Sequence, residues 1–190
     1  TRAMRNTEQL ARLIAKYRGR PCEEVDRPVN QGAMWDPLPA QGQSATLLGA
    51  PAATDFSGVE IALVGVPFDL GTTHHPGARL GPSAVRSIQE GVGPLHHRTQ
   101  VNPFALCRIA DVGDVDVRAF DLRTGLSKIE AYYTSLCAAG VTPLSVGGDH
   151  SISYPILKAL GKAPPVGLVH IDGHCDTMGA IAGEQFHHGS

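Results

Sequence analysis

The feature that most constrains this chain is an apolar run that ends directly in charged side chains, at residues 166–177. The run Val166–Ile171 is typical of a central strand of a parallel sheet, buried on both faces. Asp172, His174 and Asp176 follow it, and alternate residues of an extended chain project to one side. Charges at such a place are costly unless they are paired or bind a metal ion. Carboxylate and imidazole ligands suit manganese, nickel, zinc or iron. The alternative is an ordinary hydrogen-bonded turn.

A second polar cluster follows another short apolar segment. Val141–Val146 predicts a strand, and Gly147-Gly148-Asp149-His150-Ser151 comes next. Two adjacent glycines allow a sharp turn, which places His150 at the start of a helix expected over residues 152–160. Ligands of open α/β sheets bind at the carboxyl ends of the strands. We therefore expect one rim of the sheet to carry four metal ligands, which are His150, Asp172, His174 and Asp176.

The rest of the chain alternates predicted strands with predicted helices. Strands are expected at 59–66 and 106–112. Helices are expected at 83–90, where Pro82 suits the first turn, and at 122–139, which Gly140 ends. This alternation predicts an α/β fold with a mainly parallel sheet covered by helices. Residues 1–56 form an amino-terminal extension in this prediction, with a short amphipathic helix at 7–18 and a proline-rich segment after it. Residues 57–190 form the domain that carries the ligands.

The composition excludes several classes of partner. The net charge is −2 over 190 residues, which offers no basic surface for nucleic acid or for an anionic membrane. No apolar run is long enough to span a bilayer. The four cysteines show no C-x-x-C spacing, so a reducing, cytoplasmic location is expected. Cys175 lies between two expected ligands, and strand alternation points its thiol away from the metal.

Together these motifs resemble the ureohydrolase family, which includes arginase and agmatinase. The two main matches are GGDHS at 147–151 and D-x-H-x-D at 172–176. Further matches follow the family's order: Val64–Asp69, Gly77–Pro82, Asp111–Asp114 and His188-Gly189. The branch most similar contains agmatinase, guanidinobutyrase, guanidinopropionase and guanidine hydrolase. The resemblance implies a three-layer α/β/α sandwich of the arginase type, incomplete in this chain, because the family's second acidic motif is expected beyond Ser190. Residues 57–190 would then be the amino-terminal part of the catalytic domain.

The resemblance also implies a reaction, namely hydrolysis of a guanidino C–N bond at two divalent metal ions to give urea, or a substituted urea, and an amine. Manganese is the family's commonest metal, and some guanidine-type relatives use nickel. Carried over by position, His150, Asp172 and Asp176 hold one ion, and Asp172 bridges to a second ion that His174 also binds. Asp176 also accepts a hydrogen bond from the attacking hydroxide. His188 carries a proton to the leaving amine, with its neighbour His187 as the alternative.

The implied partner is a small cationic guanidino substrate: guanidine, guanidinopropionate, guanidinobutyrate, agmatine or a biguanide. The family also implies a homo-oligomer, a trimer or a hexamer, with a hetero-oligomer as the alternative. The sequence does not decide between these substrates or between manganese and nickel. Two other functions stay open at this stage, a non-catalytic scaffold subunit and a deacetylase-type hydrolase with one metal ion.

Two other polar clusters allow a functional and a structural interpretation. His74-His75 stands where relatives commonly have Asn-Arg, in the glycine-rich loop 70–81, and either lines the substrate entrance or is simply exposed. The acidic segment Asp111–Asp116 could pass for a metal site. The resemblance assigns it to a structural turn, which is the interpretation that we favour.

Overall fold

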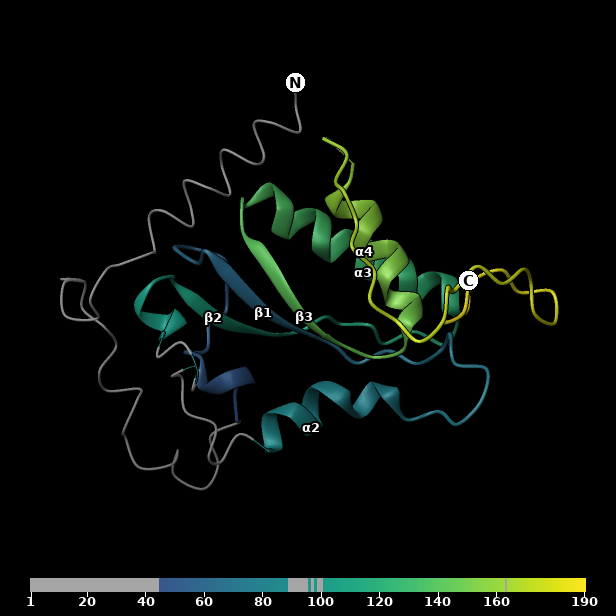
Figure 1. Cartoon of the computed structure of the whole chain (residues 1–190), viewed down its shortest axis with the longest axis horizontal. Coiled ribbons are helices and arrows are strands. Elements are labelled where there is room, and N and C mark those ends of the chain that lie inside the picture. Colours follow the sequence, from purple (N-terminus) through teal and green to yellow (C-terminus); the bar gives the residue numbers. More distant parts are fainter. Residues whose placement is uncertain (1–44, 89–95, 97, 99–100, 163) are drawn as a thin grey trace.

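The protein is described by a computed structural model over residues 45–88, 96, 98, 101–162 and 164–190. The predicted helix at 7–18 and most of the proline-rich segment lie outside these residues. Three strands form one sheet, in the order β2-β1-β3 (Figure 1). They are β1 (Ile61–Val66), β2 (Ile109–Asp114) and β3 (Thr142–Gly147). Both pairings are parallel, which confirms the predicted strands at 59–66, 106–112 and 141–146.

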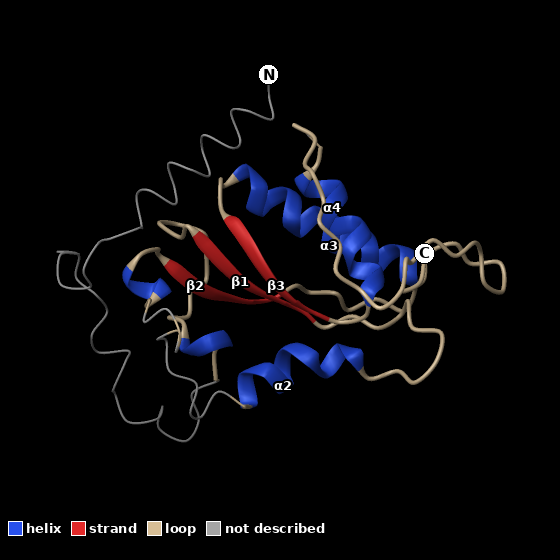
Figure 2. Ribbon diagram, viewed as in Figure 1, coloured by secondary structure: helices blue, strands red, loops and turns tan. Residues whose placement is uncertain are grey.

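Helices cover both faces of this sheet, so the three-layer α/β/α arrangement is confirmed in partial form. Figure 2 shows α3 (Leu122–Ala138) and α4 (Ser153–Leu160) on one side and α2 (Gly81–Ser87) on the other. Asp121 caps α3 by accepting a hydrogen bond of 2.8 Å from the Thr124 N–H. Short 3-10 helices complete the described elements: η2 (Leu47–Gly49), η3 (Ala78–Leu80), η4 (Pro103–Ala105) and η5 (His150–Ile152). None of the described helices is long and apolar enough to cross a membrane.

The core lies on both faces of β1, because its residues alternate between them. Ala62, Val64 and Val66 belong to the larger apolar cluster, together with buried side chains of α3 such as Ile129 and Tyr133. On the opposite face, Leu63 packs with Leu47 and Ala50. β1 is thus the central element, with both edges paired and both faces covered. Its carboxyl end and that of β3 lie side by side, since Val66 pairs with Gly147.

The predicted central strand at 166–171 is wrong. This segment is extended but forms no regular secondary structure in the part of the chain described. Its side chains are exposed rather than buried, with Val169 at 87% and Ile171 at 92%. A strand needs a neighbour that pairs with its backbone groups, and none of the described strands pairs with this segment. An apolar, β-branched composition therefore does not by itself place a segment in a sheet.

Candidate metal centre

The turn after β3 positions His150 at the carboxyl end of the sheet. Gly148 has a φ of +43°, and a Cβ atom there would lie 2.5 Å from the Phe68 carbonyl oxygen and 2.6 Å from that of Val66. A residue with a side chain would therefore push the two strand ends apart. The Asp149 N–H donates to the Phe68 carbonyl at 2.8 Å, and His150 then opens η5. The predicted turn, with a histidine at the start of a helix, is confirmed.

Four side chains meet beside this turn, and we call them the four-residue group: His150, His170, Asp172 and Asp176. One potential ligand atom from each lies within 4.8 Å of all the others. His150 Nδ1 is 3.1 Å from Asp172 Oδ2 and 2.5 Å from Asp176 Oδ2. Nitrogen and carboxylate oxygen donors at this spacing suit a manganese, nickel or zinc ion. The donor set therefore fits a divalent metal ion.

The structure brings three of the four predicted ligands into this group, and His170 joins them. His170 Nε2 lies 3.5 Å from Asp172 Oδ2. We did not predict it from the sequence. The sequence signal for His170 is its spacing. It precedes Asp172 by two residues and so continues the alternate positions 172, 174 and 176.

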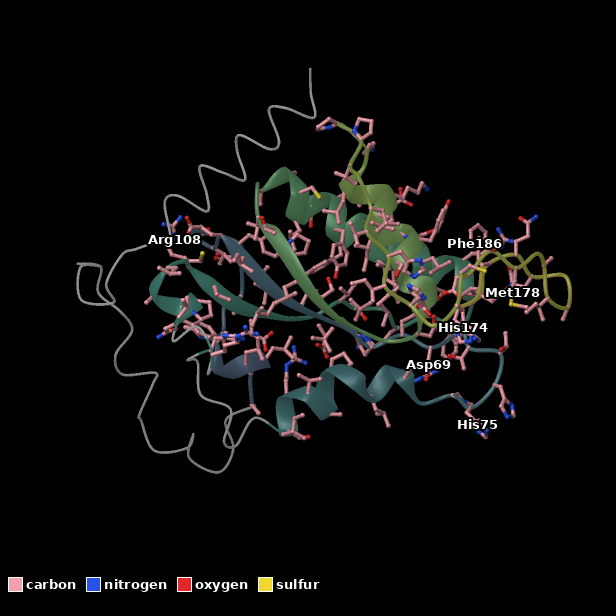
Figure 3. The ribbon with its side chains drawn as sticks, in the orientation of Figure 1. Asp69, His75, Arg108, His174, Met178 and Phe186 are labelled. Atoms are coloured by element: carbon pink, nitrogen blue, oxygen red, sulfur yellow. The ribbon has the colours of Figure 1, made fainter. Side chains whose placement is uncertain are left out.

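The fourth predicted ligand, His174, lies outside the group, with a side chain that is 87% exposed. Its Nδ1 is 3.7 Å from Asp172 Oδ1, which is the oxygen opposite the one that faces His150 and His170. The two oxygens of Asp172 therefore face different histidines. Figure 3 shows His174 at the same end of the molecule as Asp69, the residue that follows β1 by three positions.

Local hydrogen bonds keep Asp172 ionised. The His174 N–H donates to Asp172 Oδ1 at 2.9 Å, and this bond lowers the pKa of the Asp172 carboxyl most. Desolvation of the side chain opposes this effect, while the nearby His150 and His170 add to it. The resulting pKa lies below the ordinary value of an aspartate. A carboxylate that stays charged is the form that binds a cation.

His188 and His187 lie on a loop that returns to this rim. The His188 N–H donates to the Gly71 carbonyl at 2.9 Å, so the segment 178–190 folds back as the assignment of His188 requires. His188 Nδ1 is 3.1 Å from the same carbonyl and 3.3 Å from the Thr73 N–H. Both histidines line one cavity of about 720 Å³ together with His150 and Asp176. Among the described residues, none hydrogen-bonds His188 Nε2.

His187 is the less suitable proton carrier of the two. Its ring is buried, with Nδ1 accepting from the Gly189 N–H at 3.2 Å and Nε2 lying 3.0 Å from the Gly179 carbonyl. An N–H and a carbonyl as partners fix the neutral tautomer with its proton on Nε2. Both nitrogens are therefore engaged, and His187 holds the loop together.

The acidic segment begins inside β2, which ends at Asp114, and an arginine holds Asp111 there. Asp111 is buried and accepts from Arg86, from the Leu47 N–H and from the Gly113 N–H. Every one of these partners is a hydrogen-bond donor within the protein. This agrees with the structural interpretation of the acidic segment. His74 and His75 are exposed and contact each other, with ring centroids 3.8 Å apart. Cys175 is a free thiol outside the four-residue group.

Comparison with known proteins places this geometry in context. The model of the arginase family matches residues 59–190. Guanidinopropionase from Pseudomonas aeruginosa is 42% identical over 146 residues, which is 76% of this chain and 46% of that protein. The structure of proclavaminate amidino hydrolase from Streptomyces clavuligerus superposes with a TM-score of 0.73 at 32% identity, over 80% of this chain and 50% of that one. The chain spans about half the length of the curated relatives that it matches.

Similar structures include manganese-containing ones. Formiminoglutamase from Trypanosoma cruzi, in a crystal structure with Mn²⁺, superposes with a TM-score of 0.64 at 25% identity, over 77% of this chain and 50% of that one.

Proposed function

Since this chain belongs to the arginase family, we propose that the protein hydrolyses a guanidino C–N bond and releases urea, or a substituted urea, and an amine. The observation that carries the proposal is the meeting of His150, Asp172 and Asp176 at the carboxyl end of the sheet, within one group of potential ligands. The relatives' names supply the reaction class, since they include guanidinopropionase and an amidino hydrolase.

Two divalent metal ions are part of this proposal, with manganese favoured by the manganese-containing relative and nickel as the alternative. His150, Asp172 and Asp176 would hold one ion, with His170 beside them. His174 and the opposite oxygen of Asp172 would contribute to the second, since Asp172 presents one oxygen to each side. When bound, such ions would lower the pKa of a water ligand from that of bulk water to about 7, so that it would lose a proton at neutral pH.

The chain's own residues supply orientation, charge and a proton path. Asp176 can accept a hydrogen bond from the attacking water and so aim it at the guanidinium carbon. The carboxylates of Asp172 and Asp176 favour a cationic group over a neutral one. His188 would give a proton from Nε2 to the leaving amine. Its Nδ1 has both an acceptor, the Gly71 carbonyl, and a donor, the Thr73 N–H, so the ring keeps a partner in either protonation state.

The substrate is proposed to be a small guanidino compound: guanidine, guanidinopropionate, guanidinobutyrate, agmatine or a biguanide. We also propose a cytoplasmic location, from the cysteine pattern, and a homo-oligomer, a trimer or a hexamer, by analogy with the ureohydrolases. A one-metal, deacetylase-type hydrolase is the second candidate, because the four-residue group is compact enough for a single ion while His174 lies outside it. Metal content separates the two, at about two ions per chain for the first and one for the second.

The test is urea release by the protein expressed from its complete reading frame and loaded separately with Mn²⁺ or Ni²⁺. Turnover of one compound of the panel, lost in Asp176→Asn, would support the proposal. Asp55→Asn is the matched control, since Asp55 is an exposed aspartate that accepts from the Ser57 N–H, outside the four-residue group. Two bound metals with no turnover of any compound would contradict the proposed reaction. A protein that binds no metal would favour the scaffold interpretation instead.

A further inference from the structure

A buried carboxylate next to the four-residue group is not itself a member of it. Asp149 is only 7% exposed. One of its oxygens accepts from the Gly71 N–H at 2.9 Å and faces the Thr72 hydroxyl at 3.4 Å. The other accepts from the N–H of Ser151 at 2.8 Å and from its hydroxyl. Since protein donors already engage both oxygens, this carboxylate serves to join two segments of the chain.

The two segments approach too closely for a side chain between them. A Cβ atom on Gly71 would lie 2.6 Å from Ser151 Cβ and 2.9 Å from Asp149 Oδ1. Only glycine allows the backbone of the loop to reach the carboxylate at this distance. Asp149 therefore holds the start of the glycine-rich loop against the turn that carries His150.

The same loop residue holds His188 on its other side. Gly71 gives its N–H to Asp149, while its carbonyl accepts from the His188 N–H at 2.9 Å and lies 3.1 Å from His188 Nδ1. Thr73, two residues on, offers its N–H to His188 Nδ1 at 3.3 Å. Hydrogen bonds thus run without a break from Asp149, the neighbour of His150, through Gly71 to His188.

A second buried carboxylate fixes the far end of this loop. Asp69 accepts from the Gly77 N–H at 2.8 Å and from Arg79 Nε at 2.6 Å (Figure 3 labels Asp69 and, on the loop, His75). The loop is therefore held at both ends. At the Asp149 end, the hydrogen bonds of Gly71 and Thr72 connect the loop to the turn that carries His150.

We propose that Asp149 is a positioning residue for the reaction proposed above, because it sets the place of His188 relative to His150 through the backbone of Gly71. The inference rests on the proposed function for its chemistry. The hydrogen-bonded link itself is a property of the fold and can be measured without turnover.

The test compares Asp149→Asn with Asp111→Asn in the intact protein. Asparagine keeps the shape of the side chain but turns one acceptor into an NH₂ donor. Every partner of Asp149 is a donor. In either orientation of the amide, the new NH₂ donor would therefore face the donors of Gly71 or those of Ser151. Asp111 is the matched control, because it is also buried and both its oxygens are engaged by protein donors, namely Arg86 and the N–H groups of Leu47 and Gly113. It bonds neither His188 nor residues 70–77.

Histidine NMR of the metal-free protein gives the readout that does not depend on activity. We expect Asp149→Asn to shift the ring resonances of His188, and Asp111→Asn to leave them in place. An unchanged His188 in Asp149→Asn, or an equal shift in the two variants, would overturn the proposal. Ser151→Ala removes one hydroxyl donor to the same carboxylate. It is the milder variant should Asp149→Asn fail to fold, and it should move the same resonances by less.

Kinetics of the metal-loaded protein then tests the link to the reaction. Asp149→Asn should lower kcat by about 10- to 100-fold, the usual cost of losing a residue that orients a catalytic group, with KM little changed. A kcat equal to that of the wild-type protein would overturn the positioning role. Absence of urea release by the wild-type protein, with the His188 shift present, would overturn the proposed function and still support the link from Asp149 to His188.

Discussion

The substitution Asp111→Asn tests whether the acidic segment that begins inside β2 has a structural role. Asp111 is 4% exposed. Its Oδ2 accepts from the Leu47 N–H at 2.6 Å and from Arg86 Nε at 3.0 Å, and its Oδ1 accepts from the Gly113 N–H at 2.9 Å and from Arg86 Nη2 at 3.1 Å. Asparagine removes the charge, and its NH₂ group must face two of these donors in either orientation.

The expected loss can be worked from these contacts. Breaking a buried ion pair by removing one partner costs about 3–5 kcal/mol. Arg86 keeps its bond of 2.6 Å to Asp114, and its side chain is 15% exposed, so the lower end of this range applies, at about 3 kcal/mol. For a chain of this length, such a loss lowers Tm by roughly 6–12 °C.

Urea unfolding followed by circular dichroism measures the free energy of unfolding, and metal analysis of the same samples measures the ions bound. We expect the stability loss above with unchanged metal content. A loss below about 1 kcal/mol, the value of an ordinary hydrogen bond, would refute the ion-pair argument. A fall in bound metal would refute the structural interpretation of this segment and favour the metal-site alternative.

The difference in the free energy of unfolding between wild-type protein and Asp111→Asn should depend on pH, because the pKa of Asp111 is shifted. Burial raises this pKa, but the Arg86 guanidinium and the N–H groups of Leu47 and Gly113 more than offset that effect, and the net pKa lies below the ordinary value. A depressed pKa contributes stability that is complete above the unfolded-state value of about 3.9 and is lost as the pH falls through the folded-state value. The difference in the free energy of unfolding between wild-type protein and Asp111→Asn should therefore become smaller at acid pH.

Three further predictions follow from single contacts. Burial raises the pKa of Tyr133 to about 12, so the free energy of unfolding should fall as the pH rises from about 10 to 12. Tyr133→Phe loses the bond to Ser145 and should cost about 1 kcal/mol. In urea unfolding, this variant should not show the loss of stability between about pH 10 and 12. Gly71→Ala should cost about 1–3 kcal/mol by overpacking against Ser151, and an unchanged urea midpoint would contradict the close approach. His174→Ala should reduce bound manganese from about two ions per chain to about one, and retention of both ions would show that His174 is no ligand.

The elements that the sequence predicts correctly are those whose secondary structure follows from the periodicity of their own residues. β1 alternates between two apolar faces, and Leu126, Ile129, Tyr133 and Leu136 follow the helical period along one side of α3, where all four are buried. The run at 166–171 has the same apolar composition, yet its conformation depends on a partner strand. Periodicity and composition carry no information about whether such a partner is present.

The site divides in the same way. The motifs place His150 at a strand end, and they place Asp172 and Asp176 close enough to join it. How the side chains of the motif are arranged also depends on backbone torsions, such as the φ of +47° at Asp176, and these are not encoded by spacing. Two of the partners of Asp149, Thr72 and Gly71, lie 77 and 78 residues away, so its role as a joint between two segments appears only in three dimensions.

The most direct test of the central proposal is to count metal ions and urea in one sample. The protein from its complete reading frame is loaded with Mn²⁺, its metal content is measured, and urea is followed with each guanidino compound of the panel. We predict about two ions per chain and turnover of one compound. His150→Ala should lower the metal content to about one ion per chain and abolish turnover. A protein that binds no metal, or that binds two ions and releases urea from none of the compounds, would contradict the account.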